Sequence, residues 1–467
     1  MEKCKKQLSV VILAAGLGTR MKSKFPKVVF EVAGEPMVSH VIRAVRELGP
    51  EKIIPVVGHS RELVMETIKR CHGDFPDIAF VTQLEQKGTG HALLQARAEL
   101  LPDGYTMVLC GDTPLLTSAI LKNLFEFHIG NDSSATVLTT FVKNSAGYGR
   151  IVRDEKGHLA AIIEERDASS EIKKINEINT GVYVFSNKHL LDALSKLQPN
   201  NDQHEYYLTD SIGILNSQGL KVMAFAETED YLMMGINNRY ELSIANKIMH
   251  ERINKKHMLA GVTITDPAAT YIDAGVMIAN DVIIYPNTHI HGSTKIEIDC
   301  EIGPDSYIIN SKIGPGTKVI GSVIEDSEVS ANAKIGPYSH LRPGAKICES
   351  VHIGNYVEVK KSIIGKNSKA NHLAYIGDAE IGENVNFSAG AITCNYDGVN
   401  KNRTKIGDNS FVGTNSSLVA PVEIGENALV GAGSVITKNV PPFALAFERN
   451  EQTIKSDYMK KRVLKKK

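Results

Sequence analysis

Residues Ile406–Val430, IGDNSFVGTNSSLVAPVEIGENALV, carry an aliphatic residue at every sixth position, and glycine follows four of these five residues. A six-residue period of this kind is typical of a parallel β-helix. Each hexapeptide would form one short strand and one corner, with the aliphatic side chain stacked inward beneath the next coil. The glycine is expected where the chain turns tightly.

The same aliphatic–glycine pair recurs from about residue 261 to residue 440, without any helical period. An antiparallel sandwich would instead need polar–apolar alternation and hairpin dipeptides, which are sparse here. Two interruptions shift the period: the short step from Ile376 to Ile381, and the insertion TCNYDGVNKNRT at residues 393–404. An insertion in a solenoid is expected as a surface loop, and such loops commonly carry function.

The first half of the chain follows a different pattern. Strand-length runs such as LSVVILAAG and KIIPVVG alternate with helical patterns such as MVSHVIRAVRELG. This alternation predicts parallel βαβ units in a Rossmann-like doubly wound sheet. The stretch NNRYELSIANKIMHERINKKHMLAG predicts one long connecting helix. We therefore expect four parts: residues 1–232, a helical linker 233–260, a β-helix 261–449 and a basic tail 450–467.

The composition is that of an ordinary globular protein. The 467 residues include 53 Lys+Arg and 53 Asp+Glu, so charge gives no reason to expect nucleic acid as a partner. The six cysteines, of which Cys4 is the first, have no CxxC spacing, so neither a zinc site nor a disulfide framework is predicted. No signal peptide or membrane span is expected, and the predicted location is the cytoplasm.

The stretch LAAGLGTRM, Leu13–Met21, follows a buried strand and contains two glycines. Met21 occupies the third glycine position of the dinucleotide-binding fingerprint, and no P-loop GK[ST] is present. Backbone N–H groups of this loop, with Arg20 and Lys27 nearby, would suit a triphosphate. A plain strand-to-helix turn is the alternative.

Two further stretches favour a nucleotide site. GDTPLL places Asp112 at the carboxyl end of a strand, where open α/β sheets bind ligands and where a carboxylate can hold Mg²⁺. QLEQKGTGHAL offers Gln83, Gln86 and a glycine loop that would read a pyrimidine edge. The alternatives are a turn or helix cap at Asp112, and a helix start capped by Thr89.

LAAGLGTRM…PK, GTGHA, GDTPLL, YGRI, EINTGVY and GINNR, in this order, resemble the sugar-nucleotide pyrophosphorylases. Together with LRPGA, NHLAYIGDAEIGENVNFSAG and ITCNYDGVNK in the solenoid, nearly the whole chain is similar to one bacterial family. It comprises the bifunctional N-acetylglucosamine-1-phosphate uridyltransferases and glucosamine-1-phosphate acetyltransferases. The resemblance implies a left-handed β-helix and synthesis of UDP-N-acetylglucosamine for the cell envelope, with UTP and acetyl-CoA as co-substrates and Mg²⁺ as cofactor.

The resemblance assigns roles in the first half. Arg20 and Lys27 would neutralise charge during uridylyl transfer, and Asp112 and Asn237 would ligate Mg²⁺. Leu17 departs from the lysine often found at its position. The residues implied to bind UTP or the sugar nucleotide are Leu13, Ala14, Ala15, Gly16, Lys27, Gln83, Gln86, Gly88, Thr89, Gly149, Glu164, Asn179, Thr180 and Asn237.

Acetyl transfer to an amine needs a general base, and the solenoid offers His372. Beside Leu373, which is expected to point inward, this histidine also fits a structural role. The resemblance implies that His372 is the base, oriented by Glu358, and that Lys401 supports the site. It also implies ligands for glucosamine 1-phosphate (Arg342, Lys360, Tyr375, Asn386) and for acetyl-CoA (Ala389, Asn395, Tyr396, Thr414, Ala432, Arg449). Thr414 replaces a serine usual in the family.

The resemblance further implies a homotrimer assembled through the β-helix, with small-molecule substrates. Two other functions are weighed against the bifunctional enzyme. A nucleotidyltransferase with a purely assembling solenoid would leave NHLAYIGD and CNYDGVNK unexplained. A silent regulatory subunit would be expected to lack phosphate and metal ligands, yet Arg20, Lys27, Asp112 and Asn237 are all present.

Overall fold

A computed structural model describes residues 7–73 and 75–464 of the chain. Cys4 and the last three residues of the predicted basic tail, 465–467, lie outside the described residues. The chain divides into two compact units, Met1–Met249 and His250–Lys467, which are described separately below. The long helix predicted from the sequence forms as α7 (Arg239–Leu259) and runs across this division. The predicted four-part division stays a prediction.

The first unit is built on one mixed sheet with the strand order β11-β7-β10-β6-β1-β4-β5. Its strands are β1 (Leu8–Ala14), β4 (Lys52–Val57), β5 (Val81–Thr82), β6 (Tyr105–Cys110), β7 (Ala135–Phe141), β10 (Glu177–Ser186) and β11 (Val222–Glu227). β1 pairs in parallel with β4 and β6, as expected from the βαβ pattern. β10 runs antiparallel to β6 and β7, which the alternating pattern did not reveal.

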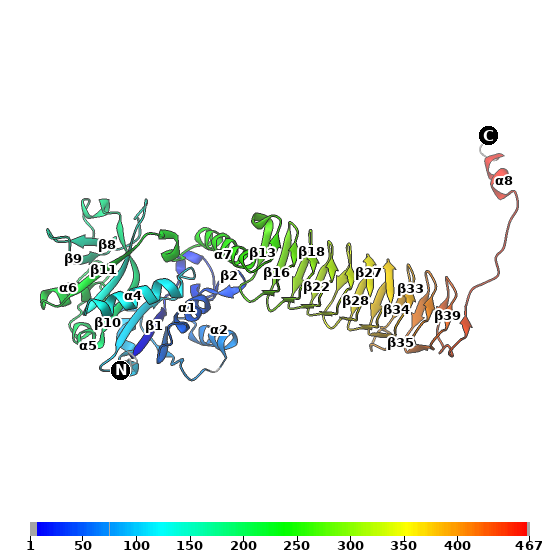
Figure 1. The fold of residues 1–467 in the computed structure, drawn as a ribbon, viewed down its shortest axis with the longest axis horizontal. Coiled ribbons are helices and arrows are strands. Elements are labelled where there is room, and N and C mark those ends of the chain that lie inside the picture. Colours follow the sequence, from blue (N-terminus) through cyan, green and yellow to red (C-terminus); the bar gives the residue numbers. More distant parts are fainter. Residues whose placement is uncertain (1–6, 74, 465–467) are drawn as a thin grey trace. The chain divides into compact units, whose positions relative to one another are not determined.

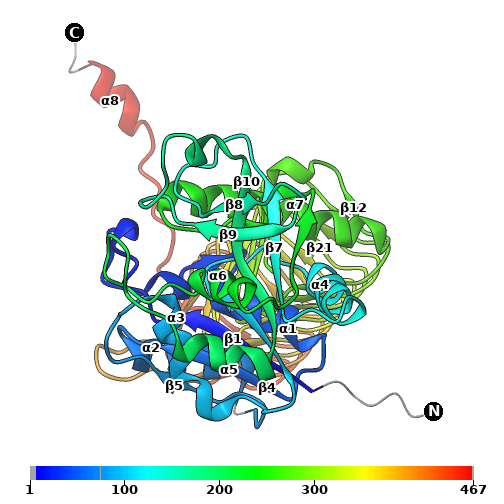
Figure 2. The same cartoon turned by 90° about the vertical axis from the view of Figure 1, so that its left-hand side faces the viewer.

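The apolar side chains of β1 point alternately to the two faces of the sheet, so both faces need to be covered, and helices lie on each of them. Val10 and Ile12 pack with α1 (Met37–Arg46), α2 (Arg61–His72) and α4 (Ser118–Gly130). Figure 2 labels these helices around β1. Val11 packs on the opposite face, in a core that the remaining helices and a small hairpin complete. These are α3 (Thr89–Gln95), α5 (Asn187–Ser195), α6 (Asp210–Ser217), β8 (Arg150–Arg153) and β9 (Leu159–Ile163). The predicted doubly wound sheet is therefore confirmed.

The second unit is a parallel β-helix made of three sheets (Figure 1). Every third strand pairs in parallel, so each coil contributes one strand to each sheet. One sheet runs from β12 (Thr263–Ile264) to β41 (Leu445–Ala446), and another from β14 (Met277–Ile278) to β38 (Val422–Ile424). The strands of the remaining sheet are β13 (Thr270–Ile272), β16 (Thr288–His291), β19 (Tyr307–Ile309), β22 (Val323–Glu325), β25 (His340–Leu341), β28 (Glu358–Lys360), β31 (Tyr375–Gly377), β34 (Ile392–Cys394), β37 (Ser417–Val419) and β40 (Val435–Ile436).

The periodic aliphatic residues form the core of the solenoid, as predicted. Ile302, Val319, Ile335 and Ile353 occupy the same position on successive coils and are paired in register. All four are at most 2% exposed. Each coil thus buries its aliphatic side chains against the coils above and below, which is how a solenoid accumulates stability.

Most of the glycines after the periodic aliphatic residues have a different physical reason from the one expected, although Gly303 and Gly336 do have positive φ. Gly365 does not have a positive φ, but a Cβ on it would overlap the carbonyl group of Gly382 on the next coil. The turn follows two residues later, at Asn367 (φ +59°), and Asn384 (φ +54°) stands likewise after Gly382. The glycines therefore permit close stacking of backbones, while asparagine takes the left-handed corner, for which it is well suited.

The predicted insertion forms a loop between β34 and β35 (Thr404–Ile406), closed by an antiparallel bridge between Tyr396 and Lys401. Leu373 was expected to point inward, and this was wrong. It adopts a left-handed corner with φ +44° and is 65% exposed, while Ile376 is the buried residue of this coil. Within residues 7–73 and 75–464, no helix is long and apolar enough to cross a membrane.

Replacing Gly365 by alanine is expected to destabilise the β-helix by about 1–3 kcal/mol, because backbone of the next coil cannot move away from the added methyl group. The guanidinium midpoint of the β-helix transition checks this. Gly213→Ala is the control, because Gly213 lies in α6 with no atom within 4 Å of the added Cβ. An unchanged midpoint in Gly365→Ala would contradict the stacking explanation.

Candidate functional sites of the two units

The first unit has a cavity of about 360 Å³ at the carboxyl ends of β1 and β6. Most of the residues predicted to bind the nucleotide line it, and the sequence analysis missed Val28, Ala92, Cys110 and Glu205. The lining residues are Leu13, Ala14, Ala15, Gly16, Leu17, Lys27, Val28, Gln83, Gln86, Gly88, Thr89, Ala92, Cys110, Asp112 and Glu205.

Lys27 is the cation at the centre of this site. Gly18 has φ +61°, and a Cβ on it would lie 2.7 Å from the Cβ of Lys27, so only glycine permits this approach. The Lys27 ammonium forms an ion pair with Asp112 and lies 3.0 Å from Oδ1 of Asn237. Arg20 donates to the same Asn237 oxygen at 2.8 Å. Side-chain oxygens of Asp112 and Asn237 and the cations of Lys27 and Arg20, which are distant in sequence, therefore meet at one point.

Asn237 is held in place by the start of α7. The Glu241 carboxylate accepts from the Asn237 backbone N–H at 2.6 Å and from the Asn238 side chain at 2.7 Å. Asn238 in turn accepts from the Glu241 backbone N–H at 2.9 Å. This reciprocal arrangement is a variant of the capping box, in which Glu241 accepts from the backbone N–H one residue before the cap, and its Asn-x-x-Glu spacing was readable in the sequence. Glu241, which positions Asn237, was not among the residues predicted from the sequence.

The glycine loop before α3 packs against residues 205–208. Gly88 has φ +100°, and a Cβ on it would lie 2.6 Å from the carbonyl oxygen of Tyr206. The Thr89 hydroxyl accepts from the Leu208 N–H at 3.0 Å, so it holds that segment rather than capping the helix. Gln83 is buried and donates to the Gly88 carbonyl at 3.1 Å. These contacts build one wall of the cavity.

The residues predicted to bind the sugar form a second group. The Gly149 carbonyl accepts from the Asn179 N–H at 2.8 Å, and a Cβ at Gly149 would touch the Glu164 carboxylate at 3.4 Å. Burial raises the pKa of Glu164. The Thr180 hydroxyl donates to the Leu138 carbonyl. The structure therefore brings Gly149, Glu164 and Asn179 together, while the Thr180 hydroxyl is occupied by backbone.

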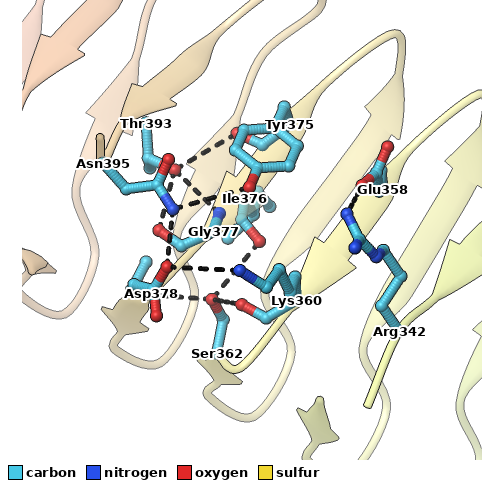
Figure 3. Close-up of polar contacts among 11 residues, drawn as sticks. Arg342, Glu358, Lys360, Ser362, Tyr375, Ile376, Gly377, Asp378, Thr393 and Asn395 are labelled. Carbon is cyan, nitrogen blue, oxygen red and sulfur yellow. Dashed lines mark hydrogen bonds and ion pairs between the residues drawn. The ribbon is translucent and has the colours of Figure 1, made fainter. Parts of the chain in front are cut away.

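In the second unit, predicted ligands from four successive coils lie along one sheet of the β-helix (Figure 3). Arg342 follows β25 and donates to Glu358 at 2.7 Å. Burial of this pair is slight, so its worth for stability is small. Glu358 was predicted to orient His372, and that role stays a prediction. In the structure its carboxylate accepts from Arg342.

Lys360, Asp378, Tyr375 and Asn395 form a polar cluster on the same sheet (Figure 3). The Lys360 ammonium lies 3.9 Å from Oδ2 of Asp378, and the Asn395 amide donates to that oxygen at 2.5 Å. The same amide lies 3.5 Å from the Tyr375 hydroxyl. The approach of Lys360 lowers the pKa of Lys401, which belongs to the inserted loop. Asp378 was not among the predicted residues.

His372 is exposed at the end of β30 (Lys369–His372), in register with Asn355 of the preceding coil. Asn386 begins β33 (Asn386–Phe387) and donates to the Ser388 hydroxyl at 2.9 Å. Tyr396 is 60% exposed, and its hydroxyl donates to the Gly398 carbonyl.

Four of the six residues predicted to bind acetyl-CoA form a column along one corner of the β-helix, while Asn395 and Tyr396 lie in the polar cluster and the inserted loop. The Ala389 carbonyl accepts from the Asn415 N–H at 2.8 Å, and the Thr414 carbonyl accepts from the Gly433 N–H at 2.8 Å. Arg449 reaches this column from the end of the solenoid, and it donates to the Ala432 carbonyl at 3.3 Å. Ala389, Thr414, Ala432 and Arg449 therefore lie along one edge.

Comparison with known proteins decides the family. Residues 9–231 match the nucleotidyl transferase model, and residues 326–361 and 403–438 match the model of bacterial transferase hexapeptides with six repeats. Curated relatives named "Bifunctional protein GlmU" match over nearly their whole length. The protein of Geobacillus sp. (strain WCH70) is 51% identical over 98% of both chains, and that of Clostridioides difficile (strain 630) is 49% identical over 97% of both.

The chain belongs to the GlmU family. The relative from Caldanaerobacter subterraneus subsp. tengcongensis, 50% identical over 98% of this chain and 99% of its own, has the same name.

The chain is thus a bifunctional transferase of nucleotide and acyl-CoA substrates. It N-acetylates glucosamine 1-phosphate and transfers uridylyl to N-acetylglucosamine 1-phosphate, as the sequence predicted. Its β-helix is of the left-handed hexapeptide type.

Glu164→Gln is expected to raise the melting temperature of the first unit at pH 7–8. Because burial raises the pKa of Glu164, the ionised carboxylate is disfavoured in the folded protein, and stability falls as pH rises from the unfolded value of about 4.3 through the raised folded value. The gain in the variant should disappear as pH falls below the ordinary carboxyl value of about 4.3.

Glu165→Gln is the matched control, and the opposite sign is expected. The pKa of Glu165 is lowered by its hydrogen bond from Arg150, whose side chain is 2% exposed. Removing this carboxylate leaves a buried guanidinium without its counter-charge at neutral pH. Melting curves of both variants between pH 4 and 8 check the signs, and a stability gain of Glu164→Gln that is constant across this range would contradict the burial argument.

Proposed function

We propose that the cavity of the first unit is the uridylyl-transfer site and that the polar cluster of the second unit is the acetyl-transfer site. The observation that supports the first assignment is the meeting of Lys27, Arg20, Asp112 and Asn237 beside a cavity at the strand ends. The second assignment is supported by cations, amides and a histidine on successive coils. In this proposal the first unit carries out uridylyl transfer and the second unit carries out acetyl transfer.

In uridylyl transfer, a phosphate oxygen of N-acetylglucosamine 1-phosphate attacks the α-phosphorus of UTP, and pyrophosphate leaves. The attacking oxygen is already ionised, so no general base is required, and catalysis is positioning and charge neutralisation. Lys27 and Arg20 supply the positive charge. Gln83, Gln86, Gly88 and Thr89 form the wall against which the uracil base is read. Gly149, Glu164 and Asn179 hold the sugar.

Mg²⁺ is the proposed cofactor of this reaction, held by Asp112 and Asn237. The fit rests on the donor set, because the oxygens of both side chains converge on one cation, the ammonium of Lys27. No cluster of three His, Cys, Asp or Glu occurs within residues 7–73 and 75–464. Two protein oxygens suit Mg²⁺, which usually keeps waters and takes further ligands from phosphates. When bound, it would supply positive charge that offsets the charge of the phosphates.

In acetyl transfer, His372 removes a proton from the ammonium of glucosamine 1-phosphate, and the free amine attacks the thioester carbonyl of acetyl-CoA. The new C–N bond forms, the C–S bond breaks, and the CoA thiolate takes up a proton. Arg342 and Lys360 bind the sugar phosphate, as charge-assisted donors do. Tyr375 and Asn386 bind its hydroxyl groups, while Asn395 and Tyr396 lie near the transferred group. Acetyl-CoA follows the column of Ala389, Thr414, Ala432 and Arg449.

A cytoplasmic homotrimer assembled through the β-helix is the proposed assembly. Hexapeptide solenoids offer three flat faces for a threefold arrangement. One corner carries Tyr338 and Tyr356, stacked 5.5 Å apart and 62% and 61% exposed, with Leu373 on the next coil. Their φ angles of +58°, +56° and +44° are costly for bulky residues, so this exposed apolar stripe supports a role in contact between copies.

His372→Ala is expected to lower kcat for acetyl transfer by about 10²–10⁴-fold through loss of the base, with uridylyl transfer unchanged. Asp112→Ala is expected to lower uridylyl transfer by about 100-fold or more and to spare acetyl transfer. Separate assays of each reaction on each purified variant check both. Loss of both activities in a folded variant would contradict two independent sites.

Light scattering of the purified full chain is expected to give three chain masses. Replacing Tyr338 and Tyr356 by serine together should shift the mass distribution toward one chain, because it removes the exposed apolar stripe. A single-chain mass for the unmodified protein would contradict the trimer.

A further inference from the structure

Asp378 is the residue of the polar cluster for which sequence reasoning assigned no role. It follows β31 at a left-handed corner with φ +49°, and its side chain is 16% exposed. Its backbone N–H donates to the Lys360 carbonyl at 3.0 Å, and its carbonyl accepts from the Thr404 N–H at 3.3 Å. The residue is therefore fixed between the preceding and following coils, with its carboxylate directed into the cluster (Figure 3).

The corner itself does not demand a carboxylate. The corresponding corners of earlier coils carry Asn310, Asp326, Gly344 and Lys361, all with positive φ. Asn310, with φ +47°, shows that an amide is accepted at this position. The chemistry of the Asp378 side chain, rather than its backbone conformation, is what distinguishes this coil.

The carboxylate determines which way the Asn395 amide points. Ionised, it can only accept hydrogen bonds, so Asn395 must turn its NH₂ group toward it. That contact is 2.5 Å, and the same NH₂ lies 3.5 Å from the Tyr375 hydroxyl oxygen. Asn395 is 7% exposed, which leaves its amide little freedom to flip. Its Oδ1 then lies on the side away from Asp378 (Figure 3).

This orientation leaves one acceptor and one donor for the substrate. The Asn395 Oδ1 remains an acceptor, which suits the N–H of an amine. The Tyr375 oxygen faces the Asn395 N–H, so its own proton is available to donate, which suits a sugar hydroxyl or phosphate oxygen. With the amide reversed, the same position would present N–H groups to the amine, which is a repulsive arrangement.

The carboxylate also acts on Lys360. The separation of 3.9 Å is within ion-pair range and beyond hydrogen-bond length. Lys360 is therefore held by charge, and this contact uses none of its three N–H donors, which remain for a phosphate. Lys401 lies close to Lys360, so the carboxylate also offsets the repulsion between two ammonium groups.

We propose that Asp378 is a positioning residue for acetyl transfer, which orients the Asn395 amide and holds the Lys360 ammonium by ion pairing while its N–H donors stay free for the sugar phosphate. This inference rests on the proposed acetyl-transfer site.

Two substitutions separate the two effects. Asp378→Asn can still accept from Asn395 through its amide oxygen but lacks the charge that holds Lys360. We expect its KM for glucosamine 1-phosphate to rise about tenfold, equal to about 1.4 kcal/mol of binding, with kcat changed less than threefold. The alkaline limb of kcat/KM should move to lower pH, because Lys401 loses the carboxylate that raises its pKa.

Asp378→Ala removes both effects, so kcat should fall as well. Asn395→Ala should also lower kcat, and the double variant should be little worse than the more impaired single variant, because both substitutions remove the same oriented amide. Asp326→Asn is the matched control, since it changes the same charge at the equivalent corner three coils earlier. This control variant should have the same kcat, KM and pH profile for acetyl transfer as the unmodified enzyme.

Uridylyl transfer by the same preparations reports the amount of folded enzyme, and light scattering reports assembly. A wild-type KM and pH profile in Asp378→Asn would overturn the electrostatic effect. Additive losses in Asp378→Ala/Asn395→Ala would overturn the orienting effect. Unchanged acetyl transfer in both Lys360→Ala and Asn395→Ala would instead show that the proposed site is wrong, so the two failures are distinguishable.

Discussion

The close stacking of coils in the β-helix is the constraint on which the second unit depends. Successive coils are joined by backbone hydrogen bonds, and adjacent parallel strands are separated by about 4.8 Å. Glycines such as Gly365 permit this approach, because a Cβ there would overlap the next coil. The same spacing fixes the distance between functional side chains. Arg342, Lys360, Tyr375 and Asn395 come from four successive coils of one sheet.

In the first unit, functional side chains are positioned by the edge of the sheet and by the start of a helix. Its cations and oxygens come from loops after parallel strands, whose carboxyl ends meet at one edge of the sheet. The exception is Asn237, which reaches the site from the start of α7. There the capping box of Asn238 and Glu241 fixes the Asn237 backbone, so helix formation and site geometry depend on the same hydrogen bonds.

Local sequence patterns predicted much of the fold and part of the candidate site. The six-residue period predicted the buried stack, and the βαβ alternation predicted a sheet with helices on both faces. The strand-end position of Asp112 predicted its place beside the cavity, where it meets Lys27. The antiparallel direction of β10 and the contact of residues 205–208 with the glycine loop were not predictable, because each depends on pairing between distant segments.

The errors have physical causes too. Glycine after each aliphatic residue was expected to make the turn, whereas on most coils the left-handed corner belongs to a later residue such as Asn384, and only Gly303 and Gly336 among these glycines have positive φ. Leu373 was expected in the core because hydrophobic residues are usually buried, but it occupies an exposed corner. Asp378 was overlooked because its partners, Lys360 and Asn395, lie one coil before and one coil after it. These three residues become neighbours only when the number of residues in each coil is known, and that number varies along this solenoid.

The modular coil has a consequence for how this chain tolerates change. Because each coil contacts only its neighbours, a whole coil gained or lost between residues 261 and 339 would leave every remaining pair of neighbours in register. Within residues 342–449 the same event would separate side chains that act together. Insertions and deletions of coil length should therefore accumulate in homologous chains before residue 340, where the solenoid can change its length without separating these side chains.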